Sequence, residues 1–181
     1  MHDSPAPSPW VQRWARLIPP GGEVLDLACA TGRHARLLAG LGHRVLALDR
    51  DAAALSSLEG VANVSTLCAD LENGTPWPLA GRQFAGVVVT NYLYRPLFPR
   101  LLEALGAGAV LIYETFAQGN ESFGKPSNPA FLLRPAELLQ AFGTELTVVA
   151  FEQGRTPRPK PAVVQRLCAL RAGVSEAALE A

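Results

Sequence analysis

The chain of 181 residues has no excess charge, few charged residues and no long apolar run, and each absence excludes a class of protein. Sixteen Lys and Arg balance sixteen Asp and Glu, which disfavours a dedicated nucleic-acid binder. No apolar stretch approaches the ~20 residues of a membrane span, and the first residues lack the pattern of a signal peptide. Because 49% of the residues are hydrophobic, intrinsic disorder is disfavoured too. One ordinary globular domain is expected.

Cysteine and histidine are also scarce. Cys29, Cys68 and Cys168 form no C-x-x-C pair, and each lies in or beside an apolar run. This pattern predicts three reduced, buried thiols in a cytoplasmic protein. With only three scattered histidines, no metal site is expected.

The fifteen prolines, in contrast, are abundant and clustered, and they separate segments with strand-like or helix-like patterns. Helices are expected at 9–18, 31–39, 51–59, 96–105 and 135–142, and strands at 23–29, 44–48, 64–68, 84–90, 109–113, 146–151 and 163–170.

The order of these segments predicts the fold class. The continuous apolar run at 84–90 indicates a strand covered on both faces, as in a parallel sheet. The last two strands have no helix between them and should form an antiparallel hairpin. We therefore expect an α/β fold, a doubly wound, Rossmann-like and mostly parallel seven-stranded sheet with an antiparallel C-terminal hairpin.

The domain is expected at 9–171, between a flexible N-terminus at 1–8 and a tail at 172–181. The polar segment 115–133 interrupts the alternation of strands and helices. Insertions of this length inside a compact domain are more often functional, which predicts a lid-like segment.

Three acidic residues end the first three strands. After Asp26, the small residues at 28, 30 and 32 allow the backbone to pass close to a ligand, and a helix begins there. Asp49 ends the second strand, where a doubly wound fold reaches a nucleoside ribose. Asp70 ends the third, where it can accept a hydrogen bond from an adenine amine.

These residues resemble the motifs of the class I S-adenosylmethionine (SAM) dependent methyltransferases, over about residues 10–170. The glycine-rich first motif of that family is similar to 26–32, its ribose-binding acid to Asp49 and its adenine-contacting acid to Asp70. Its fourth motif resembles 89–92. Thr31 to His34 and the small size resemble the bacterial small-molecule branch that includes tellurite- and thiopurine-type methyltransferases.

The resemblance implies SAM as the cofactor and methyl transfer to a small molecule as the activity. The residues expected at the cofactor are Asp26, Ala28, Cys29, Ala30, Gly32, Arg33, His34, Asp49, Arg50, Asp70, Leu71 and Asn91. Tyr92, Tyr94 and Glu114 are expected around the acceptor, since they follow the fourth and fifth strands. Whether a general base is used depends on the protonation of the acceptor.

Two departures from the family pattern bear on the chemistry. Ala28 and Ala30 stand where the family has glycines, which the fold tolerates if their φ angles stay negative. Asn91 lacks the two following prolines of the nucleic-acid and protein-glutamine branches, which disfavours nucleobase amino groups as acceptors.

Several alternatives stay open. Arg33 and His34 either meet a cofactor carboxylate or face solvent, Asp70 is either a ligand or a loop acid, and Trp10 and Trp14 are core residues or part of a lid. The chain could also be a SAM-binding sensor or structural partner without catalysis. An NAD(P)-dependent oxidoreductase is less favoured, because the G-x-G-x-x-G pattern is missing.

Overall fold

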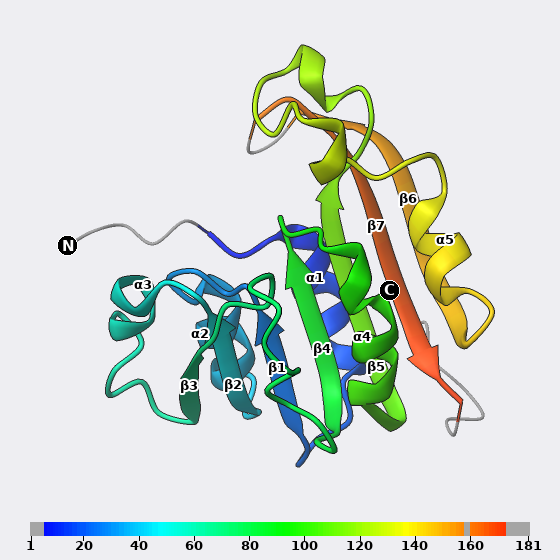
Figure 1. The fold of residues 1–181 in the computed structure, drawn as a ribbon. Coiled ribbons are helices and arrows are strands. Elements are labelled where there is room, and N and C mark those ends of the chain that lie inside the picture. Colours follow the sequence, from blue (N-terminus) through cyan, green and yellow to red (C-terminus); the bar gives the residue numbers. More distant parts are fainter. Residues whose placement is uncertain (1–5, 158–159, 173–181) are drawn as a thin grey trace.

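The computed structural model describes residues 6–157 and 160–172, which form a seven-stranded mixed sheet (Figure 1). Its strands are β1 (Glu23–Leu27), β2 (Arg44–Asp49), β3 (Val64–Cys68), β4 (Phe84–Thr90), β5 (Leu105–Phe116), β6 (Leu146–Thr156) and β7 (Ala162–Arg171). The order is β3-β2-β1-β4-β5-β7-β6, with β1 to β5 parallel and β7 antiparallel to both neighbours. The predicted fold class, including the terminal hairpin, is confirmed.

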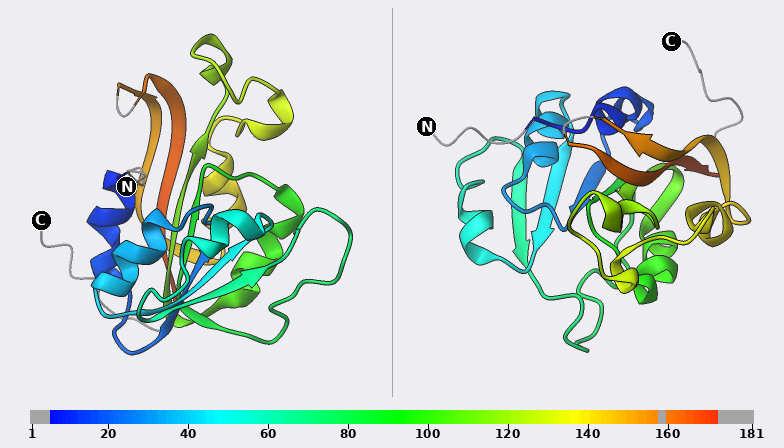
Figure 2. Two further views of the ribbon diagram at one scale, coloured as in Figure 1. Left: turned by 90° about the vertical axis from the view of Figure 1, so that its left-hand side faces the viewer. Right: turned by 90° about the horizontal axis from the view of Figure 1, so that it is seen from above.

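Helices cover both faces of this sheet. The helices are α1 (Pro9–Trp14), α2 (Arg33–Gly40), α3 (Ala52–Ser56), α4 (Phe98–Ala104) and α5 (Glu137–Phe142), with single 3₁₀ turns at Ala15–Leu17, Arg95–Leu97, Asn120–Ser122 and Pro129–Phe131. Apolar residues of α1, α2 and α3 pack in one core cluster, and those of α4 and α5 pack in the other. The left panel of Figure 2 shows the blue helices and the green helix on opposite sides of the sheet.

The first helix begins where the sequence predicts. Ser8 is its N-cap and accepts a hydrogen bond from the backbone N–H of Trp10, while Pro9 occupies the first turn. Trp10 and Trp14 are buried in the core, 4% and 6% exposed, and pack edge to face. The core interpretation of these two tryptophans is therefore confirmed.

Some helix boundaries differ from the prediction. The second helix begins at Arg33 rather than at residue 31, because Gly32 has a left-handed φ of 74° and caps it. Leu97 ends a 3₁₀ turn before α4, and Ala136, at φ 55°, delays α5 to Glu137. The third helix is one short turn rather than 51–59, although Asp51 caps it as expected.

The expectation of three buried cysteines is wrong at one position. Cys29 and Cys168 are buried, but Cys68 is exposed. The cause is topological: Cys68 lies on β3, which forms an edge of the sheet and has no fully buried residue.

Two predicted segments lie partly outside the described residues. The flexible N-terminus predicted at 1–8 is described only from residue 6, and the tail predicted at 172–181 is described only at residue 172. Ser8 is 5% exposed and is already part of the fold. Within the described ranges, no helix combines the length and the apolar character that crossing a bilayer requires.

Candidate functional site

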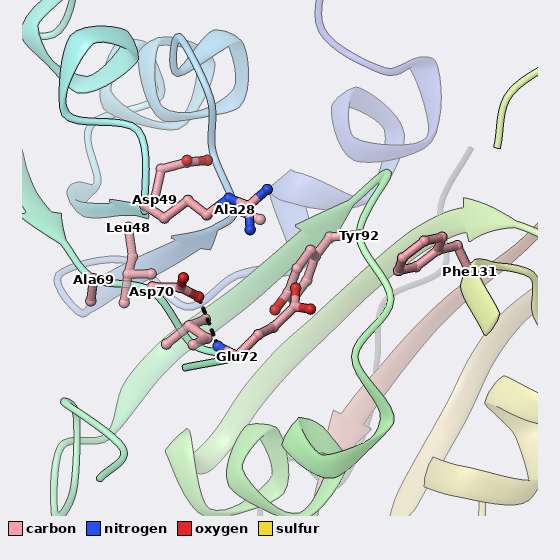
Figure 3. Close-up of a pocket in the computed structure, with 10 residues that line it drawn as sticks. Ala28, Leu48, Asp49, Ala69, Asp70, Glu72, Tyr92 and Phe131 are labelled. Atoms are coloured by element: carbon pink, nitrogen blue, oxygen red, sulfur yellow. Dashed lines mark hydrogen bonds between the residues drawn. The ribbon is translucent and has the colours of Figure 1, made fainter. Parts of the chain in front are cut away.

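A cavity of about 310 Å³ lies at the carboxyl ends of β1, β2 and β3, beside the loop after β4. In open α/β sheets, ligands bind at this edge, where the strand order reverses, here between β1 and β4. The cavity is lined by Ala28, Leu48, Asp49, Arg50, Ala69, Asp70, Leu71, Glu72, Tyr92 and Phe131 (Figure 3). The first three strand ends thus meet at one site, as the sequence predicts.

The turn after β1 is held against β2 by backbone and carboxylate contacts. The backbone N–H of Cys29 donates to the carbonyl oxygen of Leu48 at 3.1 Å. The N–H of Ala30 donates to Asp49 Oδ2 at 2.7 Å, and the N–H of Asp51 donates to Asp49 Oδ1 at 2.9 Å. Both oxygens of Asp49 are therefore fixed in direction, while the residue still lines the cavity.

The two alanines of this turn contradict the expected backbone geometry. Ala28 has a φ of 56° and Ala30 a φ of 48°, so both occupy the left-handed region instead of keeping negative angles. For a residue with a Cβ this conformation costs about 1–2 kcal/mol. The contacts of the turn with β2 offset that cost.

Gly32 has no room for a side chain in this turn. Its φ is 74°, and an added Cβ would lie 2.5 Å from both δ carbons of Leu58. Leu58, which follows α3, is buried at 1% exposure and has little room to move. The close approach of this turn to Leu58 therefore favours glycine.

Asp70 and Asn91 reach the site from the ends of two further strands. Asp70 lines the first cavity, and its Oδ1 accepts a hydrogen bond from the backbone N–H of Glu72 at 2.9 Å. Asn91 follows β4 with a left-handed φ of 54°, which asparagine tolerates well. Its N–H donates to the carbonyl oxygen of Glu114, so β5 sets its position.

Asp26 lies behind the site rather than in it. The residue is 1% exposed, and neither carboxylate oxygen has a hydrogen-bond partner among the described residues. Burial raises the pKa of Asp26 to about 7. Asp26 therefore keeps its proton to a higher pH than an exposed carboxyl group, and it lines neither cavity.

His34 was expected at the cofactor or in solvent, and both expectations are wrong. The ring is 2% exposed; Nε2 accepts from the N–H of Ser8 at 3.0 Å, and Nδ1 lies 3.3 Å from Thr90 Oγ1. Burial, with a smaller contribution from the charge of Arg33, lowers the pKa of His34 to about 3. His34 is a neutral link between the start of α1, α2 and β4. Arg33 itself is partly exposed and contacts the carbonyl oxygen of Ala6.

A second cavity of about 210 Å³ lies beside the first. Its walls are Glu72, Asn91, Tyr92, Leu93, Thr115, Phe116, Pro126 and Phe131. Three of these, Glu72, Tyr92 and Phe131, also line the first cavity. The two cavities therefore meet at these three side chains.

Of the three residues expected around the acceptor, only Tyr92 lines this junction. The expectation for Glu114 is wrong. The residue is 8% exposed, its Oε2 accepts a hydrogen bond from Nε of Arg166 at 2.5 Å, and it lines neither cavity. Glu114 instead lies opposite Arg166 in the β5–β7 pairing, and the two side chains form an ion pair. Tyr94 also lines neither cavity.

The remaining expected cofactor residues divide by position. Ala28, Asp49, Arg50, Asp70 and Leu71 line the first cavity, and Asn91 lines the second. Asp26, Cys29, Ala30, Gly32, Arg33 and His34 line neither. The turn residues among these shape the cavity through their backbone.

The segment 115–133 is tied down at both ends and contributes to the second cavity. Ala117 pairs with Leu133 in an isolated bridge, and Asn120 Oδ1 accepts from the N–H of Val163. Its wall residues are Thr115, Phe116, Pro126 and Phe131. In Figure 1 the segment rises above the sheet beside β6 and β7.

Arg95 fixes the far end of this segment. Its guanidinium donates to Glu137 Oε1 at 2.6 Å and to the carbonyl oxygens of Ala130 and Leu132 at 2.8 and 2.9 Å. Glu137 also accepts from the N–H and the side chain of Arg134. The pKa of Glu137 falls to about 2, because these hydrogen bonds and charges outweigh the opposing effect of burial. The wall residue Phe131 therefore lies between two residues whose carbonyl oxygens are hydrogen-bonded to Arg95.

Sequence reasoning missed Glu72 and did not single out Phe131. Glu72 follows Asp70 by two residues, a spacing that a strand-end acid shares with any loop acid. Phe131 gave a weak signal: it is an aromatic residue, 48% exposed, in a polar segment. In the described residues, no group of three or more His, Cys, Asp and Glu is placed to hold a metal ion.

Comparisons with a family model and with solved structures find similar proteins. Residues 24–107 match the family model of a methyltransferase domain. Among solved structures, TehB from Haemophilus influenzae superposes with a TM-score of 0.79 at 17% identity, over 94% of this chain and 64% of its own. A SAM-dependent methyltransferase from Methanosarcina mazei gives 0.70 at 14% identity, over 93% and 99%. A search of curated proteins finds no match.

A third structure is the glycopeptide N-methyltransferase MtfA in complex with S-adenosyl-L-homocysteine. It gives a TM-score of 0.61 at 17% identity, over 90% of this chain and 88% of its own. At these identities the structures show a shared fold. Together with the family-model match over 24–107, they bear out the predicted resemblance in its methyltransferase domain and its fold.

Proposed function

We propose that this chain transfers the methyl group of SAM to a small-molecule acceptor, with the cofactor in the first cavity and the acceptor in the second. The observation that carries the proposal is the junction of the two cavities at Glu72, Tyr92 and Phe131. A transfer reaction needs two binding sites that meet where the group is exchanged. The methyltransferase-domain match over 24–107 supports the reaction class.

The residues of the first cavity fit a nucleoside cofactor. Asp49 is placed to accept hydrogen bonds from ribose hydroxyls, and Asp70 from the adenine amine. The alanine and glycine backbone of the turn after β1 lets a ligand approach closely. When bound, SAM supplies a methyl group already activated by its sulfonium. The tasks left to this chain are to align the acceptor and to exclude water.

Mutation of Asp49 tests the cofactor site. Asp49→Ala removes a charged hydrogen-bond acceptor, worth roughly 1.5–3 kcal/mol, and should weaken SAM binding about 10- to 100-fold in calorimetry. Asp51→Asn is the matched control, because Asp51 caps α3 and lines neither cavity. Unchanged affinity in a folded Asp49→Ala protein would refute the ribose assignment. Binding of NAD instead of SAM would refute the cofactor.

The segment 115–133 is proposed to act as a lid over the acceptor. Limited proteolysis measures this directly, with and without SAM and its demethylated product. Ligand should protect peptide bonds near Phe123 and Phe131, which are 37% and 48% exposed. Equal cleavage in both conditions would mean that the segment is a fixed wall.

The cellular location and the extent of the domain are also proposals. The described cysteines form no disulfide, which fits reduced thiols in the cytoplasm. The methyltransferase domain is proposed to extend over 9–171. A SAM-binding domain without catalysis is the alternative, and detection of any methylated product would exclude it.

A further inference from the structure

The walls of the second cavity are mostly apolar and aromatic. Tyr92, Leu93, Phe116, Pro126 and Phe131 supply this surface. Asn91 and Thr115 add neutral polar groups. Among the described wall residues, Glu72 alone carries a charge, and that charge is negative. Such a surface favours flat apolar molecules and opposes anions.

Arg50 lines the first cavity but not the second, and the two arginines nearest the second cavity, Arg95 and Arg166, are paired with carboxylates. Arg95 follows Tyr92 by three residues, but its guanidinium donates its hydrogen bonds to Glu137 and to two backbone carbonyls. Arg166 lies between Glu114 and Glu152, which accept hydrogen bonds at 2.5 and 3.0 Å. Lys125 precedes the wall residue Pro126 but is not itself part of the wall. No described cation therefore balances Glu72 within the cavity.

Tyr92 lies beside Glu72 at the junction of the two cavities. Figure 3 shows the Tyr92 ring next to the Glu72 side chain. Burial, followed by the charge of Glu72, holds the pKa of Tyr92 well above its usual range, so its hydroxyl stays protonated. The hydroxyl of Tyr113 donates to the backbone carbonyl of Tyr92 at 3.0 Å and fixes the ring's base.

We propose that the second cavity takes a planar, apolar acceptor that bears an N–H, O–H or S–H nucleophile and no negative charge, with Glu72 as the group that accepts its proton. This inference rests on the proposed function and names its substrate class. Oxyanions such as tellurite are excluded, because their charge would face the carboxylate of Glu72 without a compensating cation.

The proposed transfer conserves atoms and charge. The lone pair of the nucleophile forms a bond to the methyl carbon, and the carbon–sulfur bond of the sulfonium breaks with its electrons returning to sulfur. The proton of the nucleophile passes to the carboxylate of Glu72. The positive sulfonium and the negative carboxylate thus both become neutral in one turnover. Glu72 touches the acceptor and is the catalytic residue of this proposal.

Binding measurements test the charge preference without the cofactor. The probes are 4-methylaniline and 4-aminobenzoate, which share a ring and a nucleophile but differ by one negative charge. We expect calorimetry to show about tenfold tighter binding of 4-methylaniline to the wild type. Glu72→Gln should remove most of that difference. Glu103→Gln, on the exposed surface of α4, should keep it.

Turnover then tests the proton step. With SAM and 4-methylaniline, Glu72→Gln should lower kcat at least tenfold, whereas Glu103→Gln should leave kcat unchanged. Equal binding of the two probes to the wild type, or methylation of tellurite, would overturn the inference. If SAM does not bind, the proposed function fails, while the binding comparison still decides the charge preference of the cavity.

Discussion

The first cavity and the second are built by different kinds of contact. At the ends of β1, β2 and β3, the shape of the site is set by hydrogen bonds between the short segments that follow neighbouring strands, such as the backbone N–H of Ala30 with Asp49. The second cavity depends on ion pairs between segments far apart in the chain, such as Arg95 with Glu137. A local motif can be recognised in a sequence, whereas a long-range pair cannot.

The largest effect should come from breaking the long-range support of the second cavity. Glu137→Gln leaves Arg95 without its carboxylate and should lower the free energy of unfolding by about 2–4 kcal/mol in urea titration, since Glu137 is only 4% exposed. Glu103→Gln removes an exposed pair with Arg100 and should change it by less than about 1 kcal/mol. Equal, small losses would show that the Arg95 contact does not hold the segment.

Two buried groups behind the first cavity respond to pH in opposite directions. The pKa of Asp26 rises from 3.8 to about 7, so the folded chain holds an extra proton in that range and stability falls as the pH rises. The pKa of His34 falls from 6.5 to about 3, so the unfolded chain holds the extra proton and stability falls as the pH falls. Between pH 4.5 and 6.5 these two dependences offset each other.

Mutating each group in turn should separate them. Relative to the wild type, Asp26→Asn should gain about 1 kcal/mol of unfolding free energy for each pH unit from 4.5 to 6.5. His34→Asn should change by a similar amount with the opposite sign. Urea titrations at three pH values measure both slopes. Parallel curves for the wild type and Asp26→Asn would show that Asp26 ionises normally.

The smallest effect concerns two glycines of one helix. Gly32→Ala forces a Cβ into a left-handed position against Leu58 and should destabilise the fold by about 1–2 kcal/mol. Gly40→Ala, at the end of α2, has open space around its Cβ and a negative φ, and should be neutral or stabilising by up to about 1 kcal/mol. Thermal unfolding of both variants makes the comparison. A tolerated Gly32→Ala would mean that the turn can shift away from Leu58.

The comparison also explains what the sequence could predict. The strand order follows from the alternation of apolar runs with helices, and the acids at the ends of β2 and β3 follow from the strand positions. Glu114 was misplaced because its carboxylate pairs with Arg166, a partner 52 residues away in the chain that only the β5–β7 pairing brings close. Glu72 was missed because only its proximity to Tyr92 distinguishes it from other loop acids.

The two left-handed alanines after β1 have a consequence for how a ligand would be received. A glycine in their place would leave the unfolded and locally opened chain many more conformations. Ala28 and Ala30 restrict the conformations open to the turn, and the hydrogen bond from the backbone N–H of Ala30 to Asp49 stabilises the observed conformation. The conformational entropy of this turn is therefore given up on folding and not on binding, and the cavity wall is pre-organised before any ligand arrives.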